Sequence, residues 1–218
     1  MGTKKDDKKG TAAPLIPEKR TLRALKVAAA GCQACPLWER GTQTVFGEGL
    51  LRSRLILVGE QPGDAEDLQG RPFVGPAGRV LDRALESAGI DRKDAYVTNV
   101  VKHFKWVPKG RLRMHQKPNG REIGACLPWL EAEIDLIRPI VLVAMGATAA
   151  QALLGKQVRV TRDHGRILSS ELAPYATVTV HPSSILRSQT DEQRHQSMSE
   201  FINDLKTAAK ILNKGSDR

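Results

Sequence analysis

The sequence predicts an α/β fold, a three-layer sandwich in which helices cover both faces of a central, mainly parallel, four-stranded sheet. Two short apolar runs, RLILV at 54–58 and IVLVAM at 140–145, have the composition of strands that are buried on both faces. Segments with helical spacing of apolar residues alternate with the strand-like runs. This alternation is typical of βαβ units, whose strands run parallel and whose connecting helices pack on the sheet.

The first helix is expected at 18–30, where Leu22 and Leu25 recur among charged residues and Gly31 provides a stop. A later helix ends before Pro139, because proline cannot continue it. The elements expected in chain order are helix 18–30, strand 54–58, helix 77–88, strand 95–101, helix 122–137, strand 140–145, strand 176–180 and helix 191–212.

The composition favours a polyanionic partner. The chain has 34 Lys and Arg against 24 Asp and Glu, which gives a formal net charge of +10, and its pI is near 9.8. A surface of this sign attracts nucleic acid or an anionic membrane. No run of about 18 uninterrupted apolar residues occurs, so no spanning helix is expected. The Lys-rich start lacks the apolar core of a signal peptide, and we expect a monomer in the cytoplasm, in the bacterial cytosol or nucleoid.

One domain is expected, at residues 18–213. Residues 1–17 mix Lys, Asp, Gly, Thr and Pro with almost no large apolar side chains. Such a segment cannot offset its ordering entropy, so it is predicted to be a disordered basic tail. Residues 214–218 are expected to form a short C-terminal tail.

Polar segments follow all four predicted strands, beginning at Gly59, Lys102, Gly146 and His181. In open parallel sheets, ligands bind outside the carboxyl ends of the strands. The candidate chemistry is therefore expected on one rim of the sheet.

The segment at 59–78 packs five glycines and three prolines around four carboxylates. It lacks the Lys-Ser/Thr of a P-loop and the spacing of GxGxxG, and its acidic content opposes phosphate binding. A rigid pocket for a neutral ring, with Phe73 as a stacking face, fits the segment better.

Basic residues dominate the stretch from Ala95 to Arg121, which holds seven Lys or Arg and no acid. Tyr96, Phe104 and Trp106 are interleaved with these charges. Basic side chains attract phosphates and aromatic rings stack on unpaired bases, so the stretch is interpreted as a DNA contact.

Three motifs occur in order, each at the end of a predicted strand: GEQPGDAEDLQGRPFVGPAGRVLDRAL from residue 59, TNVVKH from residue 98 and HPSSILR from residue 181. Together they resemble the uracil-DNA glycosylase superfamily, and within it family 4, over nearly everything from residue 22 to residue 212. The resemblance implies the uracil-DNA glycosylase fold and excision of uracil from DNA. The expected partner is uracil-containing DNA, with single strands preferred.

Two departures from ordinary family 4 resemble its UdgX branch, in which the protein becomes covalently linked to DNA. His103 stands where family 4 has one of four cluster-binding cysteines. An inserted segment, RLRMH at 111–115, is similar to the UdgX loop KRRIH, and its Arg113 and His115 match that loop. Its Arg111 and Leu112 differ from the loop's Lys and Arg, which leaves open whether the covalent activity is complete.

The cysteines suggest a metal centre. In a reducing compartment the CxxC at Cys32 and Cys35 indicates a metal ligand pair before a disulfide. Three Cys with one His suit zinc as well as an iron–sulfur centre. The resemblance makes a [4Fe–4S] cluster the expected cofactor, with zinc as the alternative. The expected ligands are Cys32, Cys35, His103 and Cys126.

The resemblance also assigns roles in a uracil pocket. Asn99 reads the edge of the base, and Phe73 stacks on the ring. Gln61 and Asp64 line the pocket, partly through the main chain. His181 stabilises the uracil anion at O2. Further DNA contacts are expected from Arg113 and from a wedge of Ile185, Leu186 and Arg187.

His115 carries the most specific hypothesis. A neutral imidazole near the pocket would capture the oxocarbenium-like sugar at C1′ and leave the protein bonded to DNA. Glu60 would orient His115 or stabilise the cation. Turnover would stop after one event, since the sequence offers no obvious means of expelling the sugar.

Three alternatives stay open. The first is a conventional family 4 glycosylase with multiple turnovers, in which His115 contacts phosphate. The second is a non-catalytic module that binds uracil or abasic DNA. The third, least favoured, is a nucleotide-binding metabolic enzyme on a doubly wound sheet.

Overall fold

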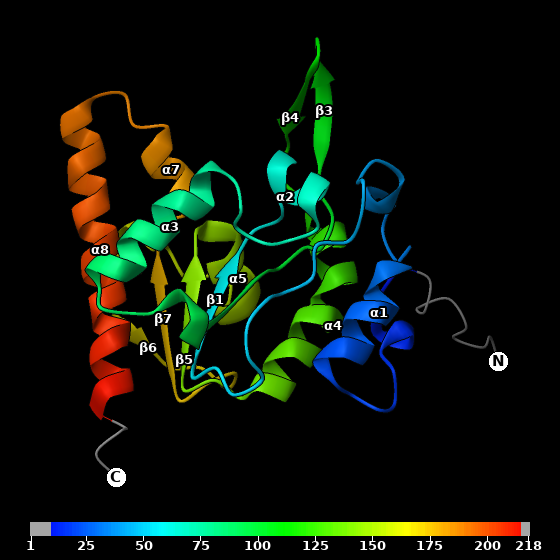
Figure 1. Ribbon diagram of the computed structural model, residues 1–218, viewed down its shortest axis with the longest axis horizontal. Helices are drawn as coiled ribbons and strands as arrows, with labels where there is room; N and C mark the ends of the chain where they lie inside the picture. The colour runs from blue at the N-terminus through cyan, green and yellow to red at the C-terminus, as the bar shows by residue number, and fades with distance from the viewer. Residues whose placement is uncertain (1–9, 215–218) are drawn as a thin grey trace.

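The chain forms a five-stranded sheet between two layers of helices (Figure 1). The computed structural model describes residues 10–214. Strands β2, β1, β5 and β7 run parallel to one another, and β6 runs antiparallel to β7. The order across the sheet is β2 (Ala95–Asn99), β1 (Leu55–Gly59), β5 (Val141–Met145), β7 (Tyr175–Thr179) and β6 (Ile167–Leu168).

The predicted α/β sandwich with a mainly parallel sheet is confirmed, but the prediction of four strands is wrong. The fifth strand, β6, has two residues at the edge of the sheet. Two extended residues carry neither an alternation nor an apolar run, so hydrophobic periodicity cannot reveal them. The four predicted strands are all present, with ends shifted by one or two residues, the usual uncertainty of element boundaries.

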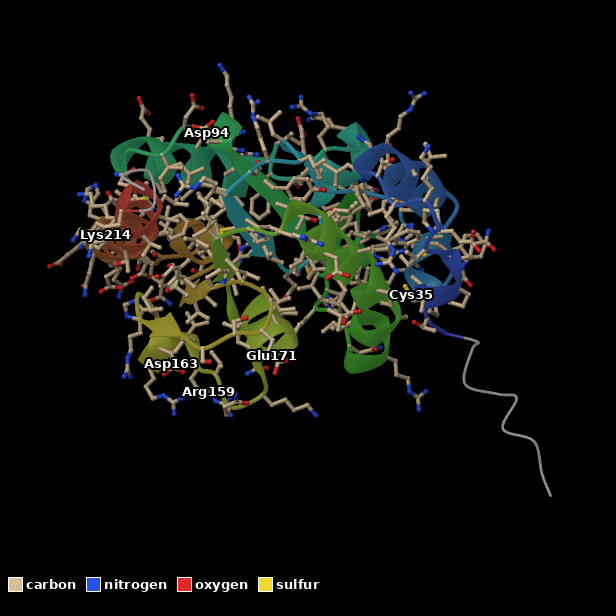
Figure 2. All side chains as sticks on the ribbon, turned by 90° about the horizontal axis from the view of Figure 1, so that it is seen from below. Cys35, Asp94, Arg159, Asp163, Glu171 and Lys214 are labelled. Atoms are coloured by element: carbon tan, nitrogen blue, oxygen red, sulfur yellow. The ribbon has the colours of Figure 1, made fainter. Side chains whose placement is uncertain are left out.

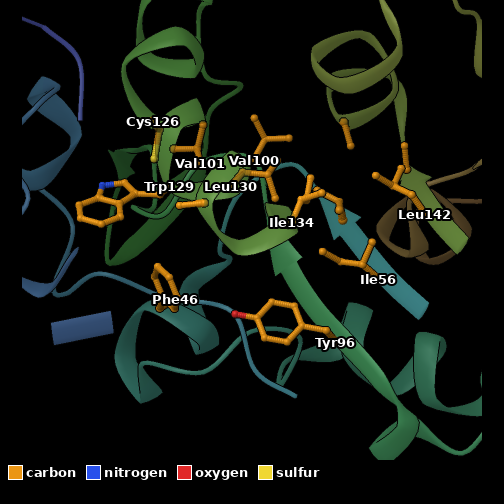
Figure 3. Close-up of a cluster of buried hydrophobic side chains, with 14 of the residues drawn as sticks. Phe46, Ile56, Tyr96, Val100, Val101, Cys126, Trp129, Leu130, Ile134 and Leu142 are labelled. Carbon is orange, nitrogen blue, oxygen red and sulfur yellow. The ribbon is translucent and has the colours of Figure 1, made fainter. Parts of the chain in front are cut away.

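Side chains of the strands alternate between two hydrophobic cores. Ile56 and Val58 of β1 belong to one core, and Leu55 and Leu57 belong to the other. Figure 3 shows Ile56 within the first core, close to Ile134. The first core is covered by α1 (Leu22–Ala30), α4 (Gly120–Ile137) and α5 (Ala147–Leu154), and the second by α3 (Pro76–Ser87), α7 (Pro182–Leu186) and α8 (Asp191–Lys214).

Side-chain caps set the starts of two helices. Thr21 accepts a hydrogen bond from the Ala24 amide at 3.1 Å, so α1 begins at Leu22 and not at residue 18. Asn119 and Glu122 form a capping box, so α4 begins at Gly120. None of the helices between residues 10 and 214 is long and apolar enough to cross a membrane. The shorter helices are α2 (Asp64–Gln69), α6 (Val160–Asp163) and three 3₁₀ turns at Ala13–Leu15, Pro36–Glu39 and Arg92–Asp94.

The expected N-terminal tail is shorter than predicted. Ala12 is fully buried, and its amide donates to the Ala125 carbonyl of α4 at 2.8 Å. A small side chain can pack closely against a helix, which a count of large apolar residues does not detect. The prediction of disorder is therefore wrong for residues 10–17. Residues 1–9 of that tail and residues 215–218 of the C-terminal tail lie outside the described residues.

The basic stretch contains a β-hairpin that the sequence analysis treated as a loop. Strands β3 (Trp106–Lys109) and β4 (Leu112–His115) pair antiparallel. Gly110 has φ of 59° at the first position of the two-residue turn, where glycine avoids a steric penalty. Figure 1 shows the hairpin projecting from the body of the molecule beside α2.

A buried ion pair lies behind the end of β2. Lys102 and Glu133 have side chains that are 1% and 0% exposed, with 2.5 Å between Nζ and Oε2. Lys102 Nζ also donates to Thr98 Oγ1 at 2.7 Å and to the Asn99 carbonyl at 2.8 Å. Because its donors reach a carboxylate, a hydroxyl and a carbonyl, the buried ammonium is fully engaged.

Candidate active site

A cavity of about 990 Å³ opens at the carboxyl ends of the strands. This is the rim on which the sequence analysis expected ligand binding. Apart from the four expected metal ligands, eleven residues were predicted for the site, and nine of these eleven line the cavity. The nine are Glu60, Gln61, Asp64, Phe73, Asn99, His115, His181, Leu186 and Arg187.

Asn99 ends β2 opposite Gly59 of β1. A Cβ at residue 59 would lie 2.4 Å from Asn99 Oδ1 and 2.6 Å from Phe73 Cζ, so only glycine leaves room for both side chains. Asn99 is 2% exposed, and its buried Oδ1 has no hydrogen-bond partner within residues 10–214. A buried acceptor without a donor is costly, and a ligand N–H would remove that cost.

Phe73 holds a strained backbone beside this acceptor. Its φ is 54°, in the left-handed region that costs a non-glycine residue about 1–3 kcal/mol. Its buried ring lies 6.0 Å from the His181 ring, centroid to centroid. The aromatic face and the amide of Asn99 thus form two walls of one site.

His181 is a neutral imidazole with a defined tautomer. The Ser183 amide donates to Nδ1 at 3.2 Å, so Nδ1 is the acceptor and the proton is on Nε2. Burial lowers the pKa of His181 to about 4. Ser183 Oγ, which lies 2.8 Å from Nδ1, accepts from Arg187. At neutral pH the ring therefore offers an N–H donor without carrying charge.

Glu60 and His115 lie side by side in the cavity lining, with 3.4 Å between Oε1 and Nε2. Thr148 Oγ1 donates to the other oxygen of Glu60. Burial raises the pKa of Glu60, but hydrogen bonds from His115 and Thr148 outweigh it and hold the pKa below its ordinary value. Glu60 is thus an anion at neutral pH, beside a half-exposed imidazole.

Gln61 joins the cavity to the base of the hairpin. Its Nε2 donates to the carbonyls of Lys105 and Gln116 at 3.2 and 3.0 Å, and its Oε1 accepts from the Lys105 amide. The amide group is therefore engaged by the chain on both sides of the hairpin. This arrangement fixes the hairpin that carries His115.

Arg113, for which a DNA contact was predicted, does not line the cavity. Its guanidinium binds Asp64, and it donates to Asp67 at 2.6 Å, both on α2. Its Cζ also lies over the rings of Phe104 and Trp106, 5.5 and 5.6 Å from the ring centroids. Charge pairing at close range satisfies the guanidinium inside the protein, so Arg113 anchors the hairpin to α2.

The predicted wedge is reduced to two residues. Ile185 is 2% exposed and belongs to the second core, so its place in the wedge is wrong. One helical turn cannot point three consecutive side chains outward. Leu186 is 42% exposed and lines the cavity with Arg187.

The three cysteines are buried: Cys32 and Cys35 follow α1, and Cys126 lies in α4. Figure 2 shows Cys35 on the far side of the molecule from Lys214. Trp129 Nε1 donates to Cys32 Sγ at 3.3 Å, and the Lys102 amide donates to Cys126 Sγ at 3.2 Å. Burial raises the pKa of Cys126 to about 12 and also raises that of Cys35. A soft metal centre is bound by thiolates, whose sulfur atoms accept such N–H hydrogen bonds, and metal binding would release the thiol protons.

The fourth expected ligand, His103, directly follows Lys102, whose amide donates to Cys126 Sγ. His103 is buried, and its Nε2 lies 3.1 Å from Thr44 Oγ1. Among the residues that the structure describes, no three His, Cys, Asp or Glu side chains are arranged to hold a metal ion. The three buried thiols suit an iron–sulfur centre, while Nε2 of His103 is engaged by Thr44 in this structure.

Among the cavity residues that sequence reasoning did not assign to the site, Thr148 and Lys117 carry polar groups of interest. Thr148 bonds to Glu60, and Lys117 lines the cavity two residues after His115. The position of Thr148 after the third strand was the available signal. Lys117 gave no signal beyond its membership of the basic stretch.

Comparison with known proteins gives the family. Residues 46–206 match the family model of the Uracil DNA glycosylase superfamily. The chain belongs to the uracil-DNA glycosylase superfamily. It is 42% identical to the type-4 uracil-DNA glycosylase of Thermotoga maritima over 164 residues, which cover 75% of this chain and 82% of that protein. It is 31% identical to the type-4 uracil-DNA glycosylase of Archaeoglobus fulgidus over 190 residues, which cover 84% of this chain and 89% of that protein.

A more distant likeness reaches another branch of the superfamily. The type-5 uracil-DNA glycosylase of Thermus thermophilus is 34% identical over 134 residues, which cover 55% of this chain and 56% of that protein. Superfamily membership and the likeness to type-4 glycosylases confirm the family expected from the motifs.

Proposed function

We propose that this protein excises uracil from DNA by cleaving the N-glycosidic bond. The observation that carries the proposal is the buried, unpartnered Oδ1 of Asn99, in the same cavity as Phe73 and His181. Uracil presents an N3–H donor to such an acceptor, a flat ring to Phe73, and O2 to the Nε2–H of His181. These three contacts match a flipped uracil better than a charged nucleotide phosphate.

In the proposed reaction the bond between C1′ and N1 of uracil breaks heterolytically. The electron pair leaves with uracil as an anion, and neutral His181 donates a hydrogen bond to O2, where the charge develops. Ionised Glu60 stabilises the cation at C1′, as carboxylates do in glycoside cleavage. Solvent then protonates the released uracil.

We propose further that His115 captures the sugar. An imidazole nitrogen gives its lone pair to C1′, which forms an N–C1′ bond and an imidazolium, and no water is consumed. Support comes from the place of His115 in the cavity wall and from the 3.4 Å separation from Glu60. The UdgX-like RLRMH segment agrees with this outcome. In the alternative, water attacks C1′ and the enzyme turns over.

We also propose that Cys32, Cys35 and Cys126, with His103, hold a [4Fe–4S] cluster, with zinc as the alternative. The three buried thiols support this, and His103, which is also buried, would be the fourth ligand in place of its contact with Thr44. Bound there, the group would supply a structural crosslink between the segment after α1 and α4. Iron and sulfide content with broad visible absorbance would support a cluster. A colourless protein with one zinc would overturn it.

We propose single-stranded uracil DNA as the preferred substrate, and a cytoplasmic monomer as the active form. Uracil release from a labelled single strand, under single-turnover conditions, tests the activity. Wild type should release uracil from uracil DNA and no base from the matching thymine strand. Asn99→Ala should slow release about 10²-fold, the usual cost of a lost transition-state hydrogen bond. Tight DNA binding by wild type without uracil release would establish a binding module instead.

A further inference from the structure

The hairpin β3–β4 has two unlike faces. Directly paired residues of antiparallel strands share a face, so Trp106 and His115 lie on one face, and Val107 and Met114 on the other. The first face is anchored: Trp106 Nε1 donates to the Arg40 carbonyl, and His115 faces Glu60. Arg113, on the same face as His115, binds α2. The second face is left for another contact.

This second face is apolar and exposed. Its three apolar side chains, Val107, Leu112 and Met114, define the outer hairpin face, and they are 38%, 72% and 38% exposed. None of them takes part in either hydrophobic core. Exposed apolar side chains that are contiguous mark a binding surface more often than scattered ones do.

The charges around the outer hairpin face select the kind of partner. Lys109 and Arg111 lie at the hairpin tip and Lys117 lies just beyond β4, all exposed. Of the seven Lys and Arg between Ala95 and Arg121, three are paired with acids and add no free charge to this face, namely Lys102, Lys105 and Arg113. A polyanion that also presents flat apolar surfaces fits this combination, and single-stranded nucleic acid is such a partner. A duplex hides its base faces in the stack, so it cannot use the apolar side chains.

The position of the hairpin brings such a strand to the cavity. His115 and Lys117 line the cavity on the hairpin side, and Leu186 and Arg187 line it from α7. Figure 1 shows the hairpin and α7 at the same end of the molecule. Each four-residue β-strand of the hairpin spans roughly 13 Å. This length is enough to contact a few nucleotides of a DNA strand that continues beyond the cavity.

We propose that the outer hairpin face binds unpaired bases that flank the uracil in single-stranded DNA, while Lys109 and Arg111 contact the phosphates. The proposal rests on the proposed function for the identity of the strand as uracil-containing DNA. It gives the hairpin a second role besides carrying His115, because it makes the protein select single strands.

Binding to DNA without uracil tests the proposal, since neither excision nor covalent capture then occurs. Fluorescence anisotropy would compare a labelled single strand with the duplex of the same sequence. The double variant Leu112→Ser with Met114→Ser should weaken single-strand binding about tenfold or more, the cost of losing stacking on one base. Duplex binding should not change. Leu51→Ser is the control, because Leu51 is 54% exposed and precedes β1, at the opposite end of the strand from the cavity.

The salt dependence of single-strand binding distinguishes the basic residues of the hairpin tip from the apolar side chains of the outer hairpin face. Lys109→Gln with Arg111→Gln should lower the slope of log Kd against log salt by about 1.4, because each lost phosphate contact removes about 0.7 on a single strand. The apolar double variant should keep the wild-type slope. Leu112→Trp should tighten single-strand binding, because a tryptophan ring stacks on a base more strongly than leucine does. A gain in affinity at this position would show that the loss in the apolar double variant does not come from misfolding.

Equal single-strand affinity in wild type, the apolar double variant and Leu51→Ser would overturn the proposal. An equal loss of duplex affinity would overturn it as well, because the face would then not read unpaired bases. Uracil release is measured separately. If release is absent but the apolar double variant still weakens single-strand binding, the proposed function fails and this inference stands.

Discussion

Oε1 of Glu60 lies 3.4 Å from Nε2 of His115. Glu60 directly follows β1, whereas His115 ends β4 of the hairpin, so the fold brings a fixed carboxylate and a projecting imidazole to one cavity wall. The hydrogen bonds that lower the pKa of Glu60 keep it ionised at neutral pH. An anion and a nucleophilic ring beside a sugar cation can stabilise it and then capture it.

His115→Ser should abolish a covalent adduct and retain uracil excision. Serine keeps a small polar side chain but lacks the ring nitrogen that would bond to C1′. The measurement is a denaturing gel of protein with labelled single-stranded uracil DNA, with uracil release followed in parallel. His195→Ser is the matched control, since His195 is an exposed histidine on α8, away from the cavity.

Two outcomes would contradict covalent capture by His115. One is release of free abasic DNA with multiple turnovers by wild type. The other is an adduct that persists in His115→Ser and forms only with borohydride, which would indicate an amine such as that of Lys117 on the cavity wall.

Glu60→Gln should slow uracil excision by about 10² to 10³-fold in single-turnover assays. The amide keeps the size of the side chain and its bond to Thr148 but removes the charge that stabilises the sugar cation. Because the pKa of Glu60 lies below its ordinary value, wild-type activity should not decline through this group until the pH falls below about 4.5. An unchanged rate in Glu60→Gln would assign the carboxylate a structural role only.

The folded protein should lose stability in acid through His181. Its pKa is about 4 in the folded protein and 6.5 for the ordinary side chain. Between these values the unfolded chain binds a proton that the folded chain does not, so the free energy of unfolding falls as the pH falls from 6.5 to 4. At about 1.4 kcal/mol per pH unit the loss is about 3 kcal/mol.

Urea unfolding at several pH values measures this loss. His181→Gln should unfold more easily at pH 7, because it removes the acceptor for the Ser183 amide, but it should depend less on pH in this window. An identical pH slope in wild type and His181→Gln would place the titration elsewhere.

The sheet and its rim were predictable because their signals are strong and local. Continuous apolar runs fix β1 and β5, and the ends of parallel strands bring Glu60 and Asn99 to one edge. The hairpin had a signal that was passed over, since Gly110 stands between two short strands as the turn requires. The two-residue β6 had none.

Side-chain direction limited the prediction of the site. The motif placed Arg113 near the cavity, but sequence order cannot show that its guanidinium pairs with Asp64 and Asp67. His103 follows the strand end as expected, yet its ring is turned to Thr44. Ile185 and Leu186 are neighbours in sequence and point to core and solvent, which depends on how α7 docks.

The buried pair Lys102–Glu133 should be strongly coupled. Glu133→Gln keeps an acceptor for Tyr96 and Gly47 but leaves the Lys102 ammonium buried without its counter-charge, so stability should fall by about 3–5 kcal/mol. Lys102→Met in the Glu133→Gln background removes the unpaired charge and should recover most of that loss. A double-mutant cycle in urea measures the coupling, which should be several times that of the exposed pair Arg194–Asp191, at most about 1 kcal/mol.

The same variants show whether the buried ion pair also affects the uracil cavity. Lys102 Nζ donates to the Asn99 carbonyl, so Lys102→Met frees the end of β2 where the uracil acceptor lies. The double variant should therefore regain stability but not the full rate of uracil release, because only the charge imbalance is repaired. Full recovery of both would show that Asn99 is positioned by the strand pairing of Gly59 alone.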